Sequence, residues 1–247
     1  MNDHGQRLTD RMTKSERDQS SPDSEPRDAA TVMLIDRAGP TAKVLLGRRH
    51  HNHKFMPGKF VFPGGRIEAL DRAMSAVSEL HPDTEAKLLE RVANPSAELA
   101  RAFALAAVRE LAEETGLLLG AKGDAAPASP GETWEEFAKA KVHPDLGGVH
   151  FIARAITPPK RPKRFDTRFF TADATGIAHK IEGVVGPDSE LVELVWMPIE
   201  EAATFDMPTI TSVILEELGA RVEAGMAHAL PVPFYYQQDG KFFRELL

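Results

Sequence analysis

An alanine-rich run near the middle of the chain, AELARAFALAAVRELAEETG at residues 97–116, constrains the fold more than any other feature. On a helical period of 3.6 residues, one stripe of this run passes through Phe103 and Ala107, and the opposite stripe is also apolar. A helix that is apolar on two sides has to be covered on two sides. Gly116 is a natural left-handed cap, so the helix is predicted to end at Thr115.

The same helix closes with four ionised side chains, Arg109, Glu110, Glu113 and Glu114. The three glutamates are spaced i, i+3, i+4, so their carboxylates share one face within one turn. Their mutual repulsion and their place near the negative end of the helix dipole each cost about a few tenths of a kcal/mol. One interpretation is a solvated acidic face. The other is a hard-cation site, because clustered carboxylates are ligands for Mg²⁺. The residues alone leave both open.

The composition excludes several classes of function. The chain has 247 residues, of which 42% are hydrophobic, and a net charge of −7. This mildly acidic balance gives no argument for a nucleic-acid or membrane partner. The absence of cysteine excludes disulfides, thiolate catalysis and cysteine-zinc sites. No apolar run approaches the roughly 20 residues that span a bilayer. We therefore expect a cytoplasmic protein.

The order of the expected elements predicts an α/β fold. Residues 1–28 are polar and of mixed charge, which predicts a disordered tail, and residues 29–247 are expected to form a single domain. Two β-rich runs flank the Ala38-Gly39-Pro40 turn and predict a hairpin. Further strands are expected at 59–62, 149–157, 168–175 and 191–199, and helices at 72–93 (broken at His81-Pro82), from Asn94-Pro95 to 115, at 132–141, 199–205 and 208–225. Interleaved strands and helices with hairpins favour a mixed sheet covered by helices.

The helix end resembles a known family motif. Residues 109–117, RELAEETGL, are similar to the core of the Nudix box, R-E-U-x-E-E-x-G-U, where U is a bulky aliphatic residue, and every fixed position is present. In that family the box begins with G-x5-E, which ends eight residues before the arginine, but Arg101 stands at that position here. The upstream stretch FPGGRIEALD supplies Gly65 and, six residues later, Asp71. We interpret residues 72–100 as a helical insertion within the box, with Asp71 in the place of the family's glutamate.

The region before the box is similar to that of the coenzyme A diphosphatases among Nudix hydrolases, and most like their peroxisomal branch. Their pattern, L-L-T-x-R-S/A-x3-R-x3-G-x3-F-P-G-G, is matched at Leu45, Leu46, Arg49, Gly58 and Phe62 to Gly65. Gly47, His50 and Lys54 depart from it. The resemblance implies a Nudix-type α/β/α sandwich with the box helix packed on the sheet. It also implies hydrolysis of coenzyme A or acyl-CoA to 3′,5′-ADP and (acyl-)phosphopantetheine.

The resemblance also assigns roles to individual residues. Glu110, Glu113, Glu114 and the backbone carbonyl of Gly64 would bind Mg²⁺ or Mn²⁺, and Arg109 would orient the glutamates. A divalent metal suits the chemistry because it neutralises a diphosphate and lowers the pKa of bound water. Residues proposed to contact substrate are Arg49, Lys54, Gly65, Arg164 and Arg168. The simpler alternative for any loop cation is a solvated counter-charge.

Two other functions remain open at this stage. One is a Nudix hydrolase of a different nucleotide diphosphate, such as ADP-ribose or NADH, which the departures from the coenzyme A pattern allow. The other is a Nudix-fold ligand sensor without catalysis, although sensors usually lose box glutamates and this chain keeps them. The expected partner is a small-molecule nucleotide diphosphate. The apolar residues of the insertion could also form a homodimer contact.

Overall fold

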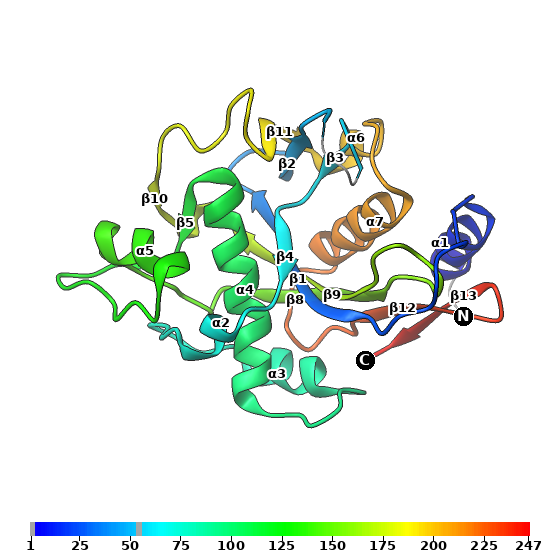
Figure 1. Ribbon diagram of the computed structural model, residues 1–247, viewed down its shortest axis with the longest axis horizontal. Helices are drawn as coiled ribbons and strands as arrows, with labels where there is room; N and C mark the ends of the chain where they lie inside the picture. Colours follow the sequence, from blue (N-terminus) through cyan, green and yellow to red (C-terminus); the bar gives the residue numbers. More distant parts are fainter. Residues whose placement is uncertain (1–2, 53–55) are drawn as a thin grey trace.

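The computed structural model describes residues 3–52 and 56–247, and a nine-stranded mixed sheet forms its centre (Figure 1). Two pairs of neighbouring strands are parallel, β1 with β9 and β8 with β12, and the other neighbours run antiparallel. In spatial order the main path is β11 (Leu191–Pro198), β2 (Lys43–Arg49), β1 (Arg27–Asp36), β9 (Phe165–Asp173), β8 (His150–Ile156), β12 (Pro233–Gln238) and β13 (Lys241–Leu246). The predicted hairpin is confirmed, since Ile35 of β1 pairs with Val44 of β2.

Helices cover both faces of this sheet. Alternate residues of β1 point in opposite directions, so Val32 and Leu34 pack with α4 (Ala97–Thr115), whereas Met33 and Ile35 pack with α7 (Thr209–Glu223). In Figure 1, α4 and α7 accordingly lie on opposite sides of the central strands. The expected α/β class, with the box helix packed on a mixed sheet, is confirmed. No helix of residues 3–52 and 56–247 is long and apolar enough to cross a bilayer.

Several further elements are short. Two strand pairs stand apart from the main sheet, β5 (Leu117–Leu119) with β10 (Ile177–Lys180), and β6 (Ala121–Lys122) with β7 (Val142–His143). The strand β3 (Phe60–Val61) adds to β2. Short helices outside the insertion include η1 (Glu132–Trp134), α5 (Glu135–Ala140), η2 (Ala174–Gly176) and α6 (Ile199–Ala202).

The box helix begins two residues later than predicted. Ser96 is its N-cap, and the Ser96 hydroxyl accepts a hydrogen bond from the backbone N–H of Leu99 at 3.2 Å. Asn94 instead has a left-handed backbone with φ of 54° and belongs to the preceding turn. The predicted end is confirmed, because Gly116 caps the helix with φ of 76°.

The prediction of a disordered tail at residues 1–28 is wrong. Residues Asp3–Lys14 form helix α1, and β1 already begins at Arg27. Leu8 and Met12, one helical turn apart, are 0% and 4% exposed and pack into the core on the α7 side of the sheet. Two apolar side chains in a charged segment gave too weak a sequence signal, because the surface that buries them comes from α7 and β13.

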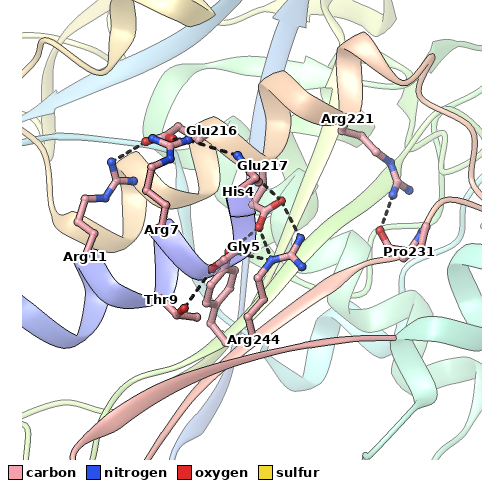
Figure 2. A network of polar contacts seen from close by, with 11 residues as sticks. His4, Gly5, Arg7, Thr9, Arg11, Glu216, Glu217, Arg221, Pro231 and Arg244 are labelled. Carbon is pink, nitrogen blue, oxygen red and sulfur yellow. Dashed lines mark hydrogen bonds and ion pairs between the residues drawn. The ribbon is translucent and has the colours of Figure 1, made fainter. Parts of the chain in front are cut away.

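Polar contacts fix α1 against α7. Figure 2 shows Arg7 and Arg11 of α1 directed at Glu216 of α7, with nitrogen–oxygen distances of 2.9 and 2.5 Å. The neighbouring Glu217 is buried and accepts from Arg244 of β13 at 2.7 Å, and His4 lies 3.8 Å from the same carboxylate. The N-terminal segment is therefore held at the junction of α7 and the last strand.

The insertion (residues 72–100) contains less helix than predicted. A short helix, α2 (Ala69–Ala73), ends before most of it, and α3 (Pro82–Leu89) begins after His81 as expected. Residues 74–81 are not helical because their backbone bonds elsewhere: the N–H of Val77 donates to Pro144 at 2.8 Å, and Ser78 accepts from Leu146 at 3.3 Å. Met74 and Leu80 are nevertheless buried in the α4 core.

Candidate functional site

The two halves of the box meet at one buried ion pair. Asp71, on α2, is 0% exposed, and its carboxylate accepts two hydrogen bonds from the Arg109 guanidinium, at 2.8 and 3.1 Å. The insertion thus leaves from α2 and returns through α4, so residues 38 positions apart are brought into contact. This geometry supports pairing Gly65–Asp71 with residues 109–117 as one interrupted motif.

Arg109 connects several parts of the site through hydrogen bonds. Its guanidinium also donates to Glu110 and Glu113, each at 2.8 Å, and to the backbone carbonyl of Arg66 at 2.8 Å. Burial opposes the charge of Arg109, but its hydrogen bonds to Asp71 and its attraction to Glu110 outweigh burial and raise the pKa of the guanidinium. The Arg109 guanidinium therefore holds two of the three box glutamates in place.

Two glycines allow the backbone to approach the helix end. The strand β4 (Gly64–Arg66) pairs with β1, opposite Ala29 to Thr31. A β-carbon on Gly64 would lie 2.3 Å from the Thr31 hydroxyl, and one on Gly65 would lie 2.2 Å from a Glu110 oxygen. Any side chain at Gly65 would thus displace the Glu110 carboxylate, which explains the Pro-Gly-Gly turn in physical terms.

A cavity of about 490 Å³ opens beside this turn. Of the residues singled out in the sequence, Arg49, Gly64, Gly65, Glu110 and Glu114 line it. The third glutamate, Glu113, is held by Arg109 at the edge and is 40% exposed. The structure therefore brings two of the three box glutamates, the glycine turn and Arg49 together around one cavity.

The carboxylates at this cavity are held in an unfavourable environment. Burial raises the pKa of Glu110 to about 7, with smaller contributions from the charges of Glu113 and Glu190, against the opposing effect of Arg109. Burial raises the pKa of Glu113 as well. The pKa of Glu114 lies well above its usual range because the side chain is buried near Glu190 and Glu110. A cation at the cavity would relieve this strain.

The donor set fits a divalent cation. Within the part of the chain that the structure describes, the Oε2 atom of Glu114 is buried without a hydrogen-bond partner. Carboxylate oxygens and a backbone carbonyl are the ligands that Mg²⁺ and Mn²⁺ prefer. Across residues 3–52 and 56–247 no three acidic or histidine groups already converge as a metal centre. The Glu110 and Glu113 carboxylates each accept a hydrogen bond from Arg109 instead.

Two predicted substrate residues lie elsewhere. Arg168 does not line the cavity: its side chain is 1% exposed, forms an ion pair with Asp28 and lies over the ring of Phe103, 3.8 Å from the ring centroid. Arg164 bonds Asp23 at 2.9 Å and borders a separate hollow. Both satisfy charges inside the fold, which spacing along the loop could not reveal. Lys54 lies outside the described residues.

Three charged residues that line the cavity were not predicted from the sequence: Arg66, Glu68 and Glu190. Lys163, in the basic loop between β8 and β9, also lines it. Glu68 stands three residues after Gly65, within the upstream half of the motif, so its position was a usable signal. Glu190 precedes β11 and reaches the cavity only because β11 pairs with β2, which the sequence does not indicate.

Two comparisons with known proteins agree with this geometry. No family model matches the chain. The chain is 28% identical, over 156 residues, to "Putative nudix hydrolase 7" of Caenorhabditis elegans; the match covers 58% of this chain and 43% of that protein, so the chain spans less than half of the relative's length. The chain is also similar to the crystal structure of a NUDIX hydrolase from Alicyclobacillus acidocaldarius, with a TM-score of 0.63 and 28% sequence identity. This match covers 84% of the present chain and 97% of the Alicyclobacillus chain. The Nudix-like fold, the rejoined box and these relatives together support placing the chain in the Nudix hydrolase superfamily.

Proposed function

We propose that the protein is a divalent-metal-dependent hydrolase of a nucleoside diphosphate linked to a second group, and that its substrate is coenzyme A or acyl-CoA. The observation that carries the proposal is the buried Asp71–Arg109 pair, which joins the interrupted box and sets Glu110 and Glu114 on one cavity. The products would be 3′,5′-ADP and phosphopantetheine or its acyl form.

The chain's residues have separable roles in this reaction. Glu110, Glu113, Glu114 and the Gly64 carbonyl would hold the cation, Mg²⁺ or Mn²⁺. Bound there, it would neutralise the diphosphate and lower the pKa of a nearby water molecule. Arg109 orients the glutamates, and Asp71 fixes Arg109 in turn. Arg49 and Lys163 line the same cavity and would attract the anionic substrate.

Substrate identity rests on the segment before the box. Its match to the coenzyme A pattern is interrupted at Gly47, but the structure gives a packing reason for that departure. A β-carbon on Gly47 would lie 2.4 Å from Leu191 of the adjacent strand β11, so glycine there makes room for a core side chain. The departure therefore carries little weight against coenzyme A. His50 and Lys54 also depart from the coenzyme A pattern, so ADP-ribose and NADH remain alternative substrates.

The first test is product analysis with a matched pair of variants. Purified protein is incubated with coenzyme A, ADP-ribose or NADH, each with Mg²⁺, Mn²⁺ or EDTA, and products are identified by mass spectrometry. We expect metal-dependent 3′,5′-ADP from coenzyme A, and a rate at least about 100-fold lower in Glu114→Gln. Glu98→Gln, an exposed position at the other end of α4, is the control.

Each outcome bears on a different part of the proposal. If only ADP-ribose or NADH is cleaved, the protein is still a diphosphate hydrolase, but coenzyme A is not its substrate. If Glu114→Gln turns over substrate as fast as wild type, Glu114 does not take part in catalysis and the proposed role of the motif is wrong. If no diphosphate is cleaved while ligands still bind, the protein is a sensor with a Nudix fold.

A further inference from the structure

A second cavity adjoins the carboxylate cavity. It has a volume of about 590 Å³. Six residues line both cavities: Met56, Thr157, Lys163, Thr167, Phe169 and Ile210. A substrate whose diphosphate lies against the box glutamates can therefore place its next group in this second hollow without leaving the protein surface.

The N-terminal segment forms one wall of this second cavity. Met12 and the residues that follow α1, from 15 to 18, line it, opposite Ala155 and Ile156 of β8. The segment is held in place because α1 packs through Leu8 and bonds Glu216 of α7. Without α1, this hollow would lack a side. The remaining wall includes Phe242 of β13, so much of the lining is apolar.

Two arginines, Arg17 and Arg161, line this second cavity. Arg17 stacks over the ring of Phe242, with its carbon 4.8 Å from the centroid, and donates to the carbonyl of Met12. Arg161 donates to the carbonyl of Asp18 at 2.7 Å. Burial and the neighbouring charge of Arg161 lower the pKa of Arg17. The two like charges are thus held near one another by backbone carbonyls.

Among residues 3–52 and 56–247, no ion pair joins Arg17 or Arg161 to an acidic side chain, although Glu16 and Asp18 also line the cavity. Hydrogen bonds from Ser20 and, to a smaller extent, the charge of Arg161 lower the pKa of the Asp18 carboxylate, so Asp18 offsets part of the positive charge of Arg161. The Asp18 carboxylate turns back to its own backbone and accepts from Ser20 at 2.9 Å. Paired guanidinium groups beside a partly apolar hollow suit an anion such as a phosphate, to which they can donate charge-assisted hydrogen bonds.

We propose that this second cavity binds the group attached to the diphosphate, and that Arg17 and Arg161 select substrates in which that group carries a phosphate monoester. The inference rests on the proposed hydrolase function and adds to it a selectivity built by the N-terminal segment of this chain. Arg17 and Arg161 would be binding residues, distant from the bond that is broken.

The test uses substrates that differ by a single phosphate. The values of kcat/KM are measured for coenzyme A against 3′-dephospho-coenzyme A and for NADPH against NADH. For whichever of these two substrate pairs the wild-type protein cleaves, kcat/KM should be about tenfold or more higher for the phosphorylated substrate. In Arg17→Gln and in Arg161→Gln the ratio should fall towards one, through a higher KM for the phosphorylated member. Lys160→Gln removes a charge from the same loop outside the cavity lining and should keep the preference.

The outcomes separate this inference from the proposed function. If wild type cleaves both members equally, or if both arginine variants keep the preference, the second cavity does not select phosphate and the inference is overturned while the hydrolase stands. If Lys160→Gln loses the preference to the same extent, general charge attraction explains it, which also overturns the inference. If no diphosphate is cleaved in any arm, the proposed function fails first. Circular dichroism of each variant checks that the fold persists.

Discussion

At the scale of single residues, the site depends on a charge pair that water does not reach. Asp71 and Arg109 are 0% and 1% exposed, so removing the carboxylate charge leaves the guanidinium buried with fewer partners. We predict that Asp71→Asn lowers the free energy of unfolding by about 3 kcal/mol, measured by urea denaturation. Asp71→Glu keeps the charge and should lose less, through crowding alone. A loss under about 0.5 kcal/mol in Asp71→Asn would show that Glu110 and Glu113 hold Arg109 without it.

At the scale of elements, α1 is held by apolar packing more than by its visible ion pairs. A helix of 12 residues is marginal in water by itself, so its order comes from docking. Leu8 is 0% exposed, whereas the side chain of Arg7 is 60% exposed. We predict that Leu8→Ala speeds amide hydrogen exchange in α1 by at least about tenfold, because truncating a buried leucine removes about 2–5 kcal/mol. Arg7→Ala, which removes only an exposed pair, should change it much less. Equal effects would contradict this ranking.

At the scale of the whole molecule, three stacked histidines join distant segments and make stability depend on pH. The ring of His228 lies 4.2 Å from that of His81 and 3.9 Å from that of His150, centroid to centroid. Burial, with the charges of His228 and Arg221, lowers the pKa of His150 to about 4. The unfolded chain binds a proton below about pH 6.5 while the folded chain does not, so stability falls from pH 6.5 towards 4. Between pH 6.5 and pH 4, the free energy of unfolding of His150→Gln should fall by about 2 kcal/mol less than that of wild type, after allowance for solvent screening. Denaturation midpoints measured across this pH range test the difference. If stability falls equally with pH in both proteins, His150 is not the cause.

The sequence by itself determined the features that depend on neighbouring residues. The helix end at Gly116 follows from a residue that tolerates a positive φ, and the first hairpin follows from a turn between β-rich runs. The spacing of Glu110, Glu113 and Glu114 on one helix face is likewise a matter of helical period. These local rules were sufficient for the α/β class and for the acidic end of the candidate site.

Only the tertiary structure decided which distant groups meet. It joined Asp71 to Arg109 across the insertion, brought Glu190 to the cavity through the pairing of β11 with β2, and buried Arg168 beneath Phe103. It also ordered α1, whose sequence is too polar to predict burial without the surface of α7 beside it. The physical reason is the same in each case: burial and charge pairing depend on both partners, and a local pattern contains only one of them.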